Sequence, residues 1–131
     1  MNGRVNRTLV AALVLTIIAV LNISAVYAAE PRYVDIALAG CDLDISNSIA
    51  ECTGWVDGRS LNNEFRITMV LYQDDNDYAT WENCDIGRAR LNETCYVTRD
   101  HEYYVGIYIA VYDPNGNFIE DAIAYTGTYY Y

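Results

Sequence analysis

Apolar and polar residues alternate along most of the chain after residue 33, which is the pattern of half-buried β-strands. The clearest example is residues 103–128, which we predict to form a long β-hairpin. Its turn is Asp113-Pro114-Asn115-Gly116, because proline has its φ angle preset and glycine can take a positive φ angle. Placing Asp113 opposite Asn117 predicts one aliphatic face, made of Val105, Ile107, Val111, Ile119, Ile123 and Tyr125.

The other face of this hairpin is aromatic. Tyr104, Tyr108 and Tyr112 stand at every fourth position, so they share one side of a strand at intervals of about 13 Å. Phe118 joins them opposite Tyr112. We expect the aliphatic face to belong to the core. The aromatic face is either an exposed binding surface or a second packed layer under a loop or the tail at residues 129–131.

Five further segments have strand character, namely residues 33–45, 49–56, 64–72, 78–86 and 89–97. The apolar phase of the first segment changes at Ala39-Gly40, which predicts a β-bulge. In the second segment, Trp55 faces outward if Cys52 faces inward. With the hairpin, these segments give about seven short strands and no helical period. This pattern is typical of an all-β protein, a small antiparallel β-sandwich of immunoglobulin-like type.

The first 28 residues have the pattern of a secretory signal peptide. Arg4 and Arg7 precede the apolar run at residues 9–21, and Val26 and Ala28 fit the small-residue rule at a cleavage site. An uncleaved membrane anchor is the alternative, but the apolar run is short for a span of about 20 residues. We therefore predict a single secreted domain at residues 29–131, with no membrane span after cleavage.

Four cysteines fall in the predicted domain: Cys41, Cys52, Cys84 and Cys95. An even number in a secretory context indicates two disulfides. The sequence interval from Cys41 to Cys52 is the same as that from Cys84 to Cys95, and it fits two neighbouring strands joined by a short loop. We predict the pairs Cys41–Cys52 and Cys84–Cys95, and a crossed pairing that links two sheets is the alternative.

Charge narrows the range of partners. Cleavage would leave six arginines, no lysine and all 18 acidic residues, a net formal charge of −12. Such a surface repels nucleic acid and anionic lipid, and it attracts cationic partners or divalent ions. The acidic loop with Asp74, Asp75 and Asp77 could ligate calcium, but it lacks the spacing, the glycine and the distal glutamate of an EF-hand loop, so a solvated hairpin tip is the favoured interpretation. We predict no cofactor.

No catalytic constellation is evident. His101 is the only histidine, and the serines of the predicted domain, Ser46, Ser48 and Ser60, fall in predicted turns. Nothing in the sequence places a serine hydroxyl beside this imidazole, as nucleophilic catalysis requires. We therefore predict that the protein is not an enzyme, and a small hydrolase built around His101 is the weakest of the functions considered.

Several motifs spread over most of the chain are shared with a known family. They are the signal peptide, Cys41-x-Leu43-x-Ile45, Ala50-x-Cys52, Ile67–Tyr72, Trp81, Cys95–Val97 and Tyr103–Val111. Through them the sequence resembles a family of small secreted bacterial proteins, a domain of unknown function found mainly in Gram-positive gut bacteria. This chain differs from that family in being acidic, rich in tyrosine and free of lysine. The resemblance implies a secreted all-β domain and implies no site residues, because the family has no assigned chemistry.

These observations favour a non-catalytic extracellular interaction module. In the first hypothesis, the tyrosine-rich sheet face binds a protein partner, because aromatic side chains are effective anchors in interfaces. In the second hypothesis, the same face binds a carbohydrate, with aromatic rings stacked on sugar rings. The predicted binding residues in both cases are Tyr104, Tyr108, Tyr112, Phe118 and Trp55.

Overall fold

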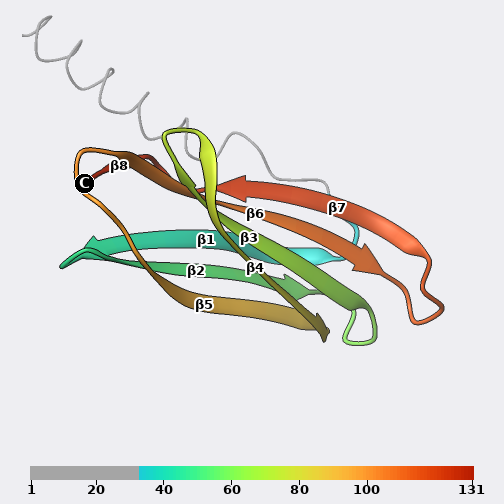
Figure 1. Ribbon diagram of the computed structural model, residues 1–131. Coiled ribbons are helices and arrows are strands. Elements are labelled where there is room, and N and C mark those ends of the chain that lie inside the picture. Colours follow the sequence, from blue (N-terminus) through green and yellow to red (C-terminus); the bar gives the residue numbers. More distant parts are fainter. Residues whose placement is uncertain (1–32) are drawn as a thin grey trace, which may run out of the picture. The chain divides into compact units, whose positions relative to one another are not determined.

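The computed structural model describes residues 33–131, and every regular element in this range is a β-strand (Figure 1). Strands β1, β2 and β5 form a three-stranded antiparallel sheet, sheet A, and strands β4, β3, β6 and β7 form sheet B in that order, with β8 paired to β6. The prediction of an all-β fold is confirmed, but the described residues form eight strands and not about seven, because the tail adds β8. The strands are β1 (Ile36–Ser46), β2 (Ile49–Gly58), β3 (Glu64–Gln73), β4 (Asn76–Ile86), β5 (Arg88–Tyr96), β6 (Glu102–Tyr112), β7 (Phe118–Tyr125) and β8 (Tyr129–Tyr130).

Short turns connect the strands within each sheet. The β1–β2 and β3–β4 turns each have two residues with positive φ, Asn47 and Ser48 in one and Asp74 and Asp75 in the other. Positive φ at both positions gives the turn the twist of its flanking strands. The chain then crosses from sheet B to sheet A through one residue, Gly87, at φ 79°. Glycine takes this conformation without steric cost.

The core lies between the two sheets, where both contribute alternate residues. The alternation predicted for residues 64–72 is confirmed, because the odd-numbered residues of β3 are buried. The aliphatic face predicted for β6 is likewise buried, from Val105 to Val111. Sheet A supplies Ala50, Cys52 and Val56 from β2, so Trp55 faces outward as predicted.

A buried tyrosine joins the connection before β6 to the core. Tyr103 is 0% exposed, and its hydroxyl donates to the Thr98 carbonyl oxygen at 2.9 Å. The same hydroxyl accepts hydrogen bonds from the Thr98 amide at 3.1 Å and from Gln73 Nε2 at 2.7 Å. A buried phenol must find hydrogen-bond partners, and these three bonds fix the path of the chain as it passes from sheet A to sheet B.

The register of the last hairpin differs from the prediction. The turn is as expected: the Asp113 amide donates to the Asn117 carbonyl oxygen at 2.9 Å, and Tyr112 pairs with Phe118. Ile119 is then an extra residue, because the next pair is Val111 with Glu120. One extra residue turns every later side chain of the strand to the opposite face. Ile123 and Tyr125 therefore point outward, 57% and 56% exposed, whereas Ala122 is buried.

The bulge brings Glu120 to the beginning of β1. Its Oε1 atom accepts hydrogen bonds from the amides of Asp35 at 2.6 Å and Ile36 at 2.9 Å, and its Oε2 atom accepts one from Val34 at 2.9 Å. Hydrogen bonds to an ionised carboxylate are stronger than neutral ones. This side chain therefore holds the start of sheet A against the edge of sheet B.

The predicted disulfides are not found, and all four cysteines are free thiols. The β1–β2 turn is centred one residue later than predicted, so Cys52 faces Leu43 and Cys41 faces Gly54. Cys84 faces Arg66 on sheet B, whereas Cys95 lies on β5 of sheet A. Diagonal positions in a sheet are about 7–8 Å apart, which is too far for a disulfide without backbone movement.

Two smaller expectations were also wrong. The irregularity in the first strand lies at Ala37, between the pairs of Ile36 and Leu38, and not at Ala39-Gly40. The tail does not cover the aromatic row, because it forms β8, where Tyr129 pairs with Tyr103. The predicted signal peptide, residues 1–28, lies outside the described residues. Within residues 33–131, no helix is available to cross a membrane.

Candidate functional site

The most distinctive surface is the face of sheet B that points away from the core. The strand register places its side chains in rows across four strands. One row runs Glu82, Thr68, Tyr108, Ile123, and the next runs Cys84, Arg66, Ala110, Asp121. We call this surface the outer face. Four large side chains on it are more than half exposed: Phe118 at 58%, Ile123 at 57%, Tyr125 at 56% and Ile86 at 54%.

Four tyrosines form a cluster at one end of the outer face: Tyr72, Tyr104, Tyr108 and Tyr125. The rings of Tyr72 and Tyr104 stack at 4.6 Å and 17°, and Tyr125 contacts Tyr104 and Tyr108 edge-on, each at 6.2 Å. The Tyr108 hydroxyl is hydrogen-bonded to those of Tyr72 and Tyr125. The predicted row is therefore half-buried by neighbouring tyrosines, which use part of their ring faces on one another.

A glycine makes room for this cluster. Gly106 lies between Tyr104 and Tyr108 on β6, opposite Tyr125 on β7 and Val70 on β3. A Cβ atom at this position would lie 2.8 Å from a Tyr125 ring carbon and 3.2 Å from a Tyr72 ring carbon. Both rings therefore rest over backbone that only glycine leaves free. They also cover Val70, which faces outward but is only 6% exposed.

A second aromatic group lies at the other end of the outer face. Tyr112 and Phe118 contact edge-on at 5.9 Å, as the prediction required. The Arg66 guanidinium lies 4.2 Å above the Tyr112 ring, and its Nε atom is 2.5 Å from Glu64 Oε1. This cation is thus held between a ring face and a carboxylate.

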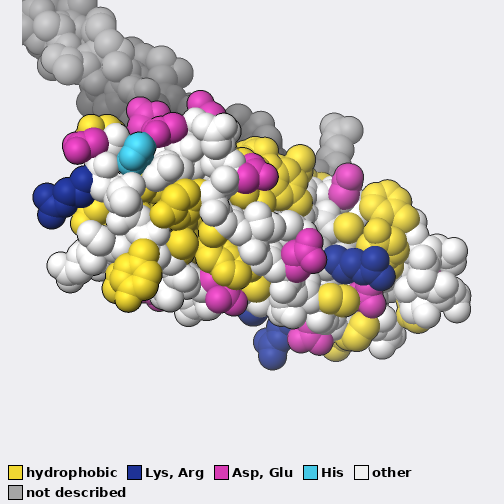
Figure 2. Space-filling model, viewed as in Figure 1, with side chains coloured by type: hydrophobic (Ala, Val, Ile, Leu, Met, Phe, Trp, Pro, Cys, Tyr) yellow, Lys and Arg dark blue, Asp and Glu magenta, His cyan; other side chains and the backbone are white. Residues whose placement is uncertain are grey.

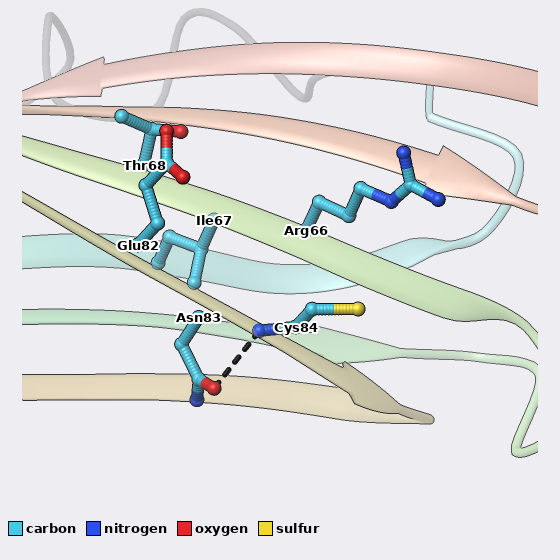
Figure 3. A pocket seen from close by; sticks show the side chains of 6 residues that line it. All are labelled: Arg66, Ile67, Thr68, Glu82, Asn83 and Cys84. Carbon is cyan, nitrogen blue, oxygen red and sulfur yellow. Dashed lines mark hydrogen bonds between the residues drawn. The ribbon is translucent and has the colours of Figure 1, made fainter.

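Two shallow hollows lie between these groups, on either side of Arg66 and Thr68. The larger, of about 470 Å³, lies along β3 and β4 and is lined by Glu82 and Cys84 as well (Figure 3). Figure 3 shows Thr68 and Glu82 extending to one side of these strands and Asn83 to the other. The second, of about 330 Å³, lies towards β7 and includes Tyr108, Asp121 and Ile123 in its lining.

The pKa values of three of these phenols, Tyr104, Tyr108 and Tyr125, are raised. Burial, and next a hydrogen bond to Asp75, raise the pKa of Tyr104, whereas the hydrogen bond to Tyr108 is the main cause for Tyr125. The pKa of Tyr108 is lowered by its bond to Tyr125 but raised more by Tyr72, burial and Asp77 together. These three phenols therefore stay protonated hydrogen-bonding groups at neutral pH.

Trp55 lies apart from the tyrosines. It is on the outer side of sheet A, and a Cβ atom on Gly40 of the neighbouring strand would lie 2.5 Å from a carbon of its indole ring. The ring thus packs flat across β1. The structure does not bring Trp55 together with the other predicted binding residues, which all lie on sheet B.

His101 pairs with the acidic β3–β4 turn. Its Nδ1 atom is 2.5 Å from Asp74 Oδ2, and Asp74 Oδ1 accepts the amide of Glu102 at 3.0 Å. The Glu102 amide and then His101 hold the pKa of Asp74 below its usual value. Figure 2 shows the histidine among acidic side chains at this end. In the described part of the chain, no group of three or more His, Cys, Asp or Glu side chains could hold a metal ion. The loop with Asp74, Asp75 and Asp77, considered above for calcium, therefore shows no such group.

The cysteines are poor nucleophiles in this structure. Burial raises the pKa of Cys41 to about 11 and that of Cys52 to about 12, and it also raises the pKa of Cys95 and Cys84. A raised pKa leaves little of the reactive thiolate at neutral pH. The Cys41 thiol instead contacts the Val105 carbonyl oxygen at 3.7 Å, across the core.

Four contributors to the outer face were missed from the sequence: Arg66, Tyr72, Ile123 and Tyr125. Arg66 and Tyr72 share the parity of Thr68 in the cleanly alternating segment, so pairing β3 with β6 would have found them. Ile123 and Tyr125 were assigned to the core, because a bulge at Ile119 leaves no signal in the alternation.

A scan against models of known protein families gives no match, and a search of curated proteins also finds none. The function must therefore be argued from the geometry of the chain itself.

Proposed function

We propose that this protein is a secreted, non-catalytic interaction module that binds a protein partner through the outer face of sheet B. The observation that carries the proposal is the exposure of Phe118, Ile123 and Tyr125 along β7 on one sheet face, where Tyr125 belongs to the tyrosine cluster, Ile123 follows it and Phe118 lies at the other end. Exposed apolar and aromatic side chains gathered on one face mark interaction sites on soluble domains. Tyrosine is also enriched among the residues that dominate binding energy.

The topology supports an immunoglobulin-like assignment. Immunoglobulin domains pack two antiparallel sheets with strands A, B and E in one and C, F and G in the other. Strands β1, β2, β5 and β3, β6, β7 occupy the corresponding places, and the fourth strand, β4, pairs with β3. The bonds of Tyr103 to Thr98 match the tyrosine corner found at the start of strand F in such domains. Modules of this architecture present sheet faces and edges to partners.

The arrangement of the rings favours a protein partner over a carbohydrate. Sugar stacking needs a free, flat ring face, but Tyr72 and Tyr104 stack on each other and Tyr125 meets its neighbours edge-on. The hydroxyls of Tyr108 and Tyr125 bond to each other as well. Carbohydrate binding at the same face is the second candidate, since Asp121 and the hydroxyls beside the smaller hollow could accept from sugar hydroxyls.

The surroundings of His101 support the absence of a catalytic role. Its Nδ1 atom is engaged by Asp74. Among the described residues, the hydroxyl of Ser48 contacts Tyr131 and that of Ser60 contacts the Asn62 amide, so neither is bonded to the imidazole. General-base catalysis requires the nucleophile within hydrogen-bond reach.

Capture experiments with a surface variant test the proposal. Phe118→Ser/Ile123→Asp removes two exposed apolar side chains without touching the hydrogen-bonded tyrosines. Leu38→Asp is the matched control, because Leu38 is 59% exposed on the outer side of sheet A. A partner identified by mass spectrometry with the native protein should be retained by the control. Its affinity for the double variant should fall by about 30-fold or more.

Equal retention by the double variant, with its melting temperature unchanged, would refute the proposal. A glycan array run with the same three proteins separates the second candidate. A polysaccharide that binds the native protein and the control but not the double variant would favour carbohydrate binding.

A further inference from the structure

We infer that the outer face of sheet B recognises a cationic protein segment, whose basic side chains enter the two hollows on either side of Arg66 and Thr68. This inference rests on the proposed function, because it specifies the chemistry of the partner at the same face. It is carried by the unpaired carboxylates of the hollows and by the way in which the face already binds one guanidinium.

Charge on the outer face is strongly one-sided. The register places Glu64, Asp77, Glu82 and Asp121 on it, and Arg66 is the only cation that residues 33–131 contribute there. Arg66 is already matched by Glu64, so the remaining charge is negative. Glu82 lines one hollow and Asp121 the other, and neither forms an ion pair with any residue between 33 and 131. Both are exposed and open to a partner.

The face itself shows how a guanidinium is held there. Arg66 lies over the ring of Tyr112 while Glu64 binds its Nε atom. The smaller hollow offers the same combination, with Tyr108 as the aromatic ring and Asp121 as the carboxylate. Exposed Ile123 beside them provides an apolar surface for the alkyl stem of an incoming arginine or lysine. Because the hollow is shallow and Asp121 and Ile123 are exposed, such a cation–π contact would contribute as an exposed one, beside the ion pair.

The positions of the two carboxylates set the spacing of the ligand. Glu82 is on β4 and Asp121 is on β7, which are three strand positions apart in sheet B. With neighbouring strands about 4.8 Å apart, the separation across the sheet is about 14 Å. The two carboxylates also lie in rows two residues apart along the strands, an offset of about 7 Å, so their Cα atoms are about 16 Å apart. An extended peptide crosses about 13 Å in four residues, and the length of the arginine or lysine side chains covers the remainder. Two basic side chains four residues apart can therefore reach the two hollows.

Other occupants fit less well. An anionic partner would meet Arg66, whose charge is already matched, and a surplus of carboxylates. A second copy of this chain would bring the same acidic face, so two copies packed face to face would repel each other. A neutral partner would leave Glu82 and Asp121 desolvated without a counter-charge, which is costly.

Fluorescence polarisation with labelled peptides tests the inference. The probe is a short Gly/Ser peptide that carries two arginines four residues apart, and its controls carry glutamine or glutamate in their place, or two adjacent arginines. The spaced-arginine peptide should bind the native protein, and the neutral and acidic peptides should not. Its affinity should decrease as salt is raised from about 20 to 200 mM.

Charge-neutral variants give the matched comparison. Glu82→Gln/Asp121→Asn should weaken binding of the spaced-arginine peptide by about tenfold, since two ion pairs with some cation–π support are lost. Asp44→Asn/Glu51→Gln removes the same number of charges from an adjacent pair on the outer side of sheet A. This control should change binding by less than about twofold.

Three results would overturn the inference: no binding of the spaced-arginine peptide at about 1 mM, an equal loss in both double variants, or preferential binding of the acidic peptide. The proposed function is judged separately. A captured partner whose retention depends on Phe118 and Ile123, but not on Glu82 and Asp121, would leave the interaction module standing and refute only its cationic ligand.

Discussion

The hydroxyl of Tyr103 allows a sharp test of the fold. Tyr103→Phe keeps the buried ring but removes one donor and one acceptor group that together make three hydrogen bonds, with the Thr98 carbonyl, the Thr98 amide and Gln73. Each bond contributes about 1 kcal/mol net, and the groups left behind in a buried site lose their partners. The expected decrease in the free energy of unfolding is about 3 kcal/mol. Domains typically have a free energy of unfolding of about 5–15 kcal/mol, so this decrease is a large fraction of it.

Urea unfolding followed by tryptophan fluorescence measures this change. With an m-value of about 1–2 kcal/mol/M, the midpoint should fall by about 1.5–3 M while m stays constant. Tyr130→Phe is the control, because Tyr130 is 67% exposed and its replacement should change stability by less than about 0.5 kcal/mol. If Tyr103→Phe and Tyr130→Phe unfolded at the same urea concentration, the three hydrogen bonds of the Tyr103 hydroxyl would not stabilise the fold.

Gly106→Ala should move the Tyr125 ring off the sheet, because the new methyl group overlaps it. Quenching of tyrosine fluorescence by a solvent-borne quencher should then increase, and unchanged quenching would contradict this packing of Tyr125 on Gly106. Iodoacetamide applied to the folded protein should modify Cys84 first, since the other cysteines are more buried. Peptide mass spectrometry gives the order of modification. If none of the four cysteines reacted with iodoacetamide, disulfides would be indicated instead. Asp74 has a lowered pKa, so its contribution to stability is present above its usual value of 3.8 and is lost as the pH falls through the folded value. Asp74→Asn should therefore flatten the fall in melting temperature between about pH 4 and pH 2. An unaltered slope would show that the bonds of the Asp74 carboxylate to the Glu102 amide and to His101 contribute nothing to this pH dependence.

The sequence predicted elements and faces well where one rule decided them. Alternation placed β3 and β6 correctly, because one side of each strand is entirely apolar. The turn at Asp113 was also predictable, since its carboxylate accepts the amides of Asn115 and Asn117 at 2.9 and 2.8 Å. These are local interactions, which a short stretch of sequence contains completely.

Register was not predictable in the same way. The bulge at Ile119 is coupled to bonds between Glu120 and the start of β1, more than eighty residues away along the chain. The equal cysteine spacing suggested a register for β1 and β2 that the Asn47-Ser48 turn does not adopt. The same limit applied to the outer face of sheet B. Its β6 residues were predicted from the sequence, whereas its β7 residues depend on the one inserted residue at Ile119.

The Glu120 carboxylate also determines how the domain would respond to mechanical force. Tension applied before Tyr33 reaches the amides of residues 34–36 first, and these are attached to β7 of the other sheet. The three bonds share one carboxylate, so they bear load in parallel and fail together. A partner pulling on sheet B would thus be linked to the N-terminal end of the domain through the Glu120 side chain, and the bonds of Asp35 to Ser60 and Asn63 would share the load.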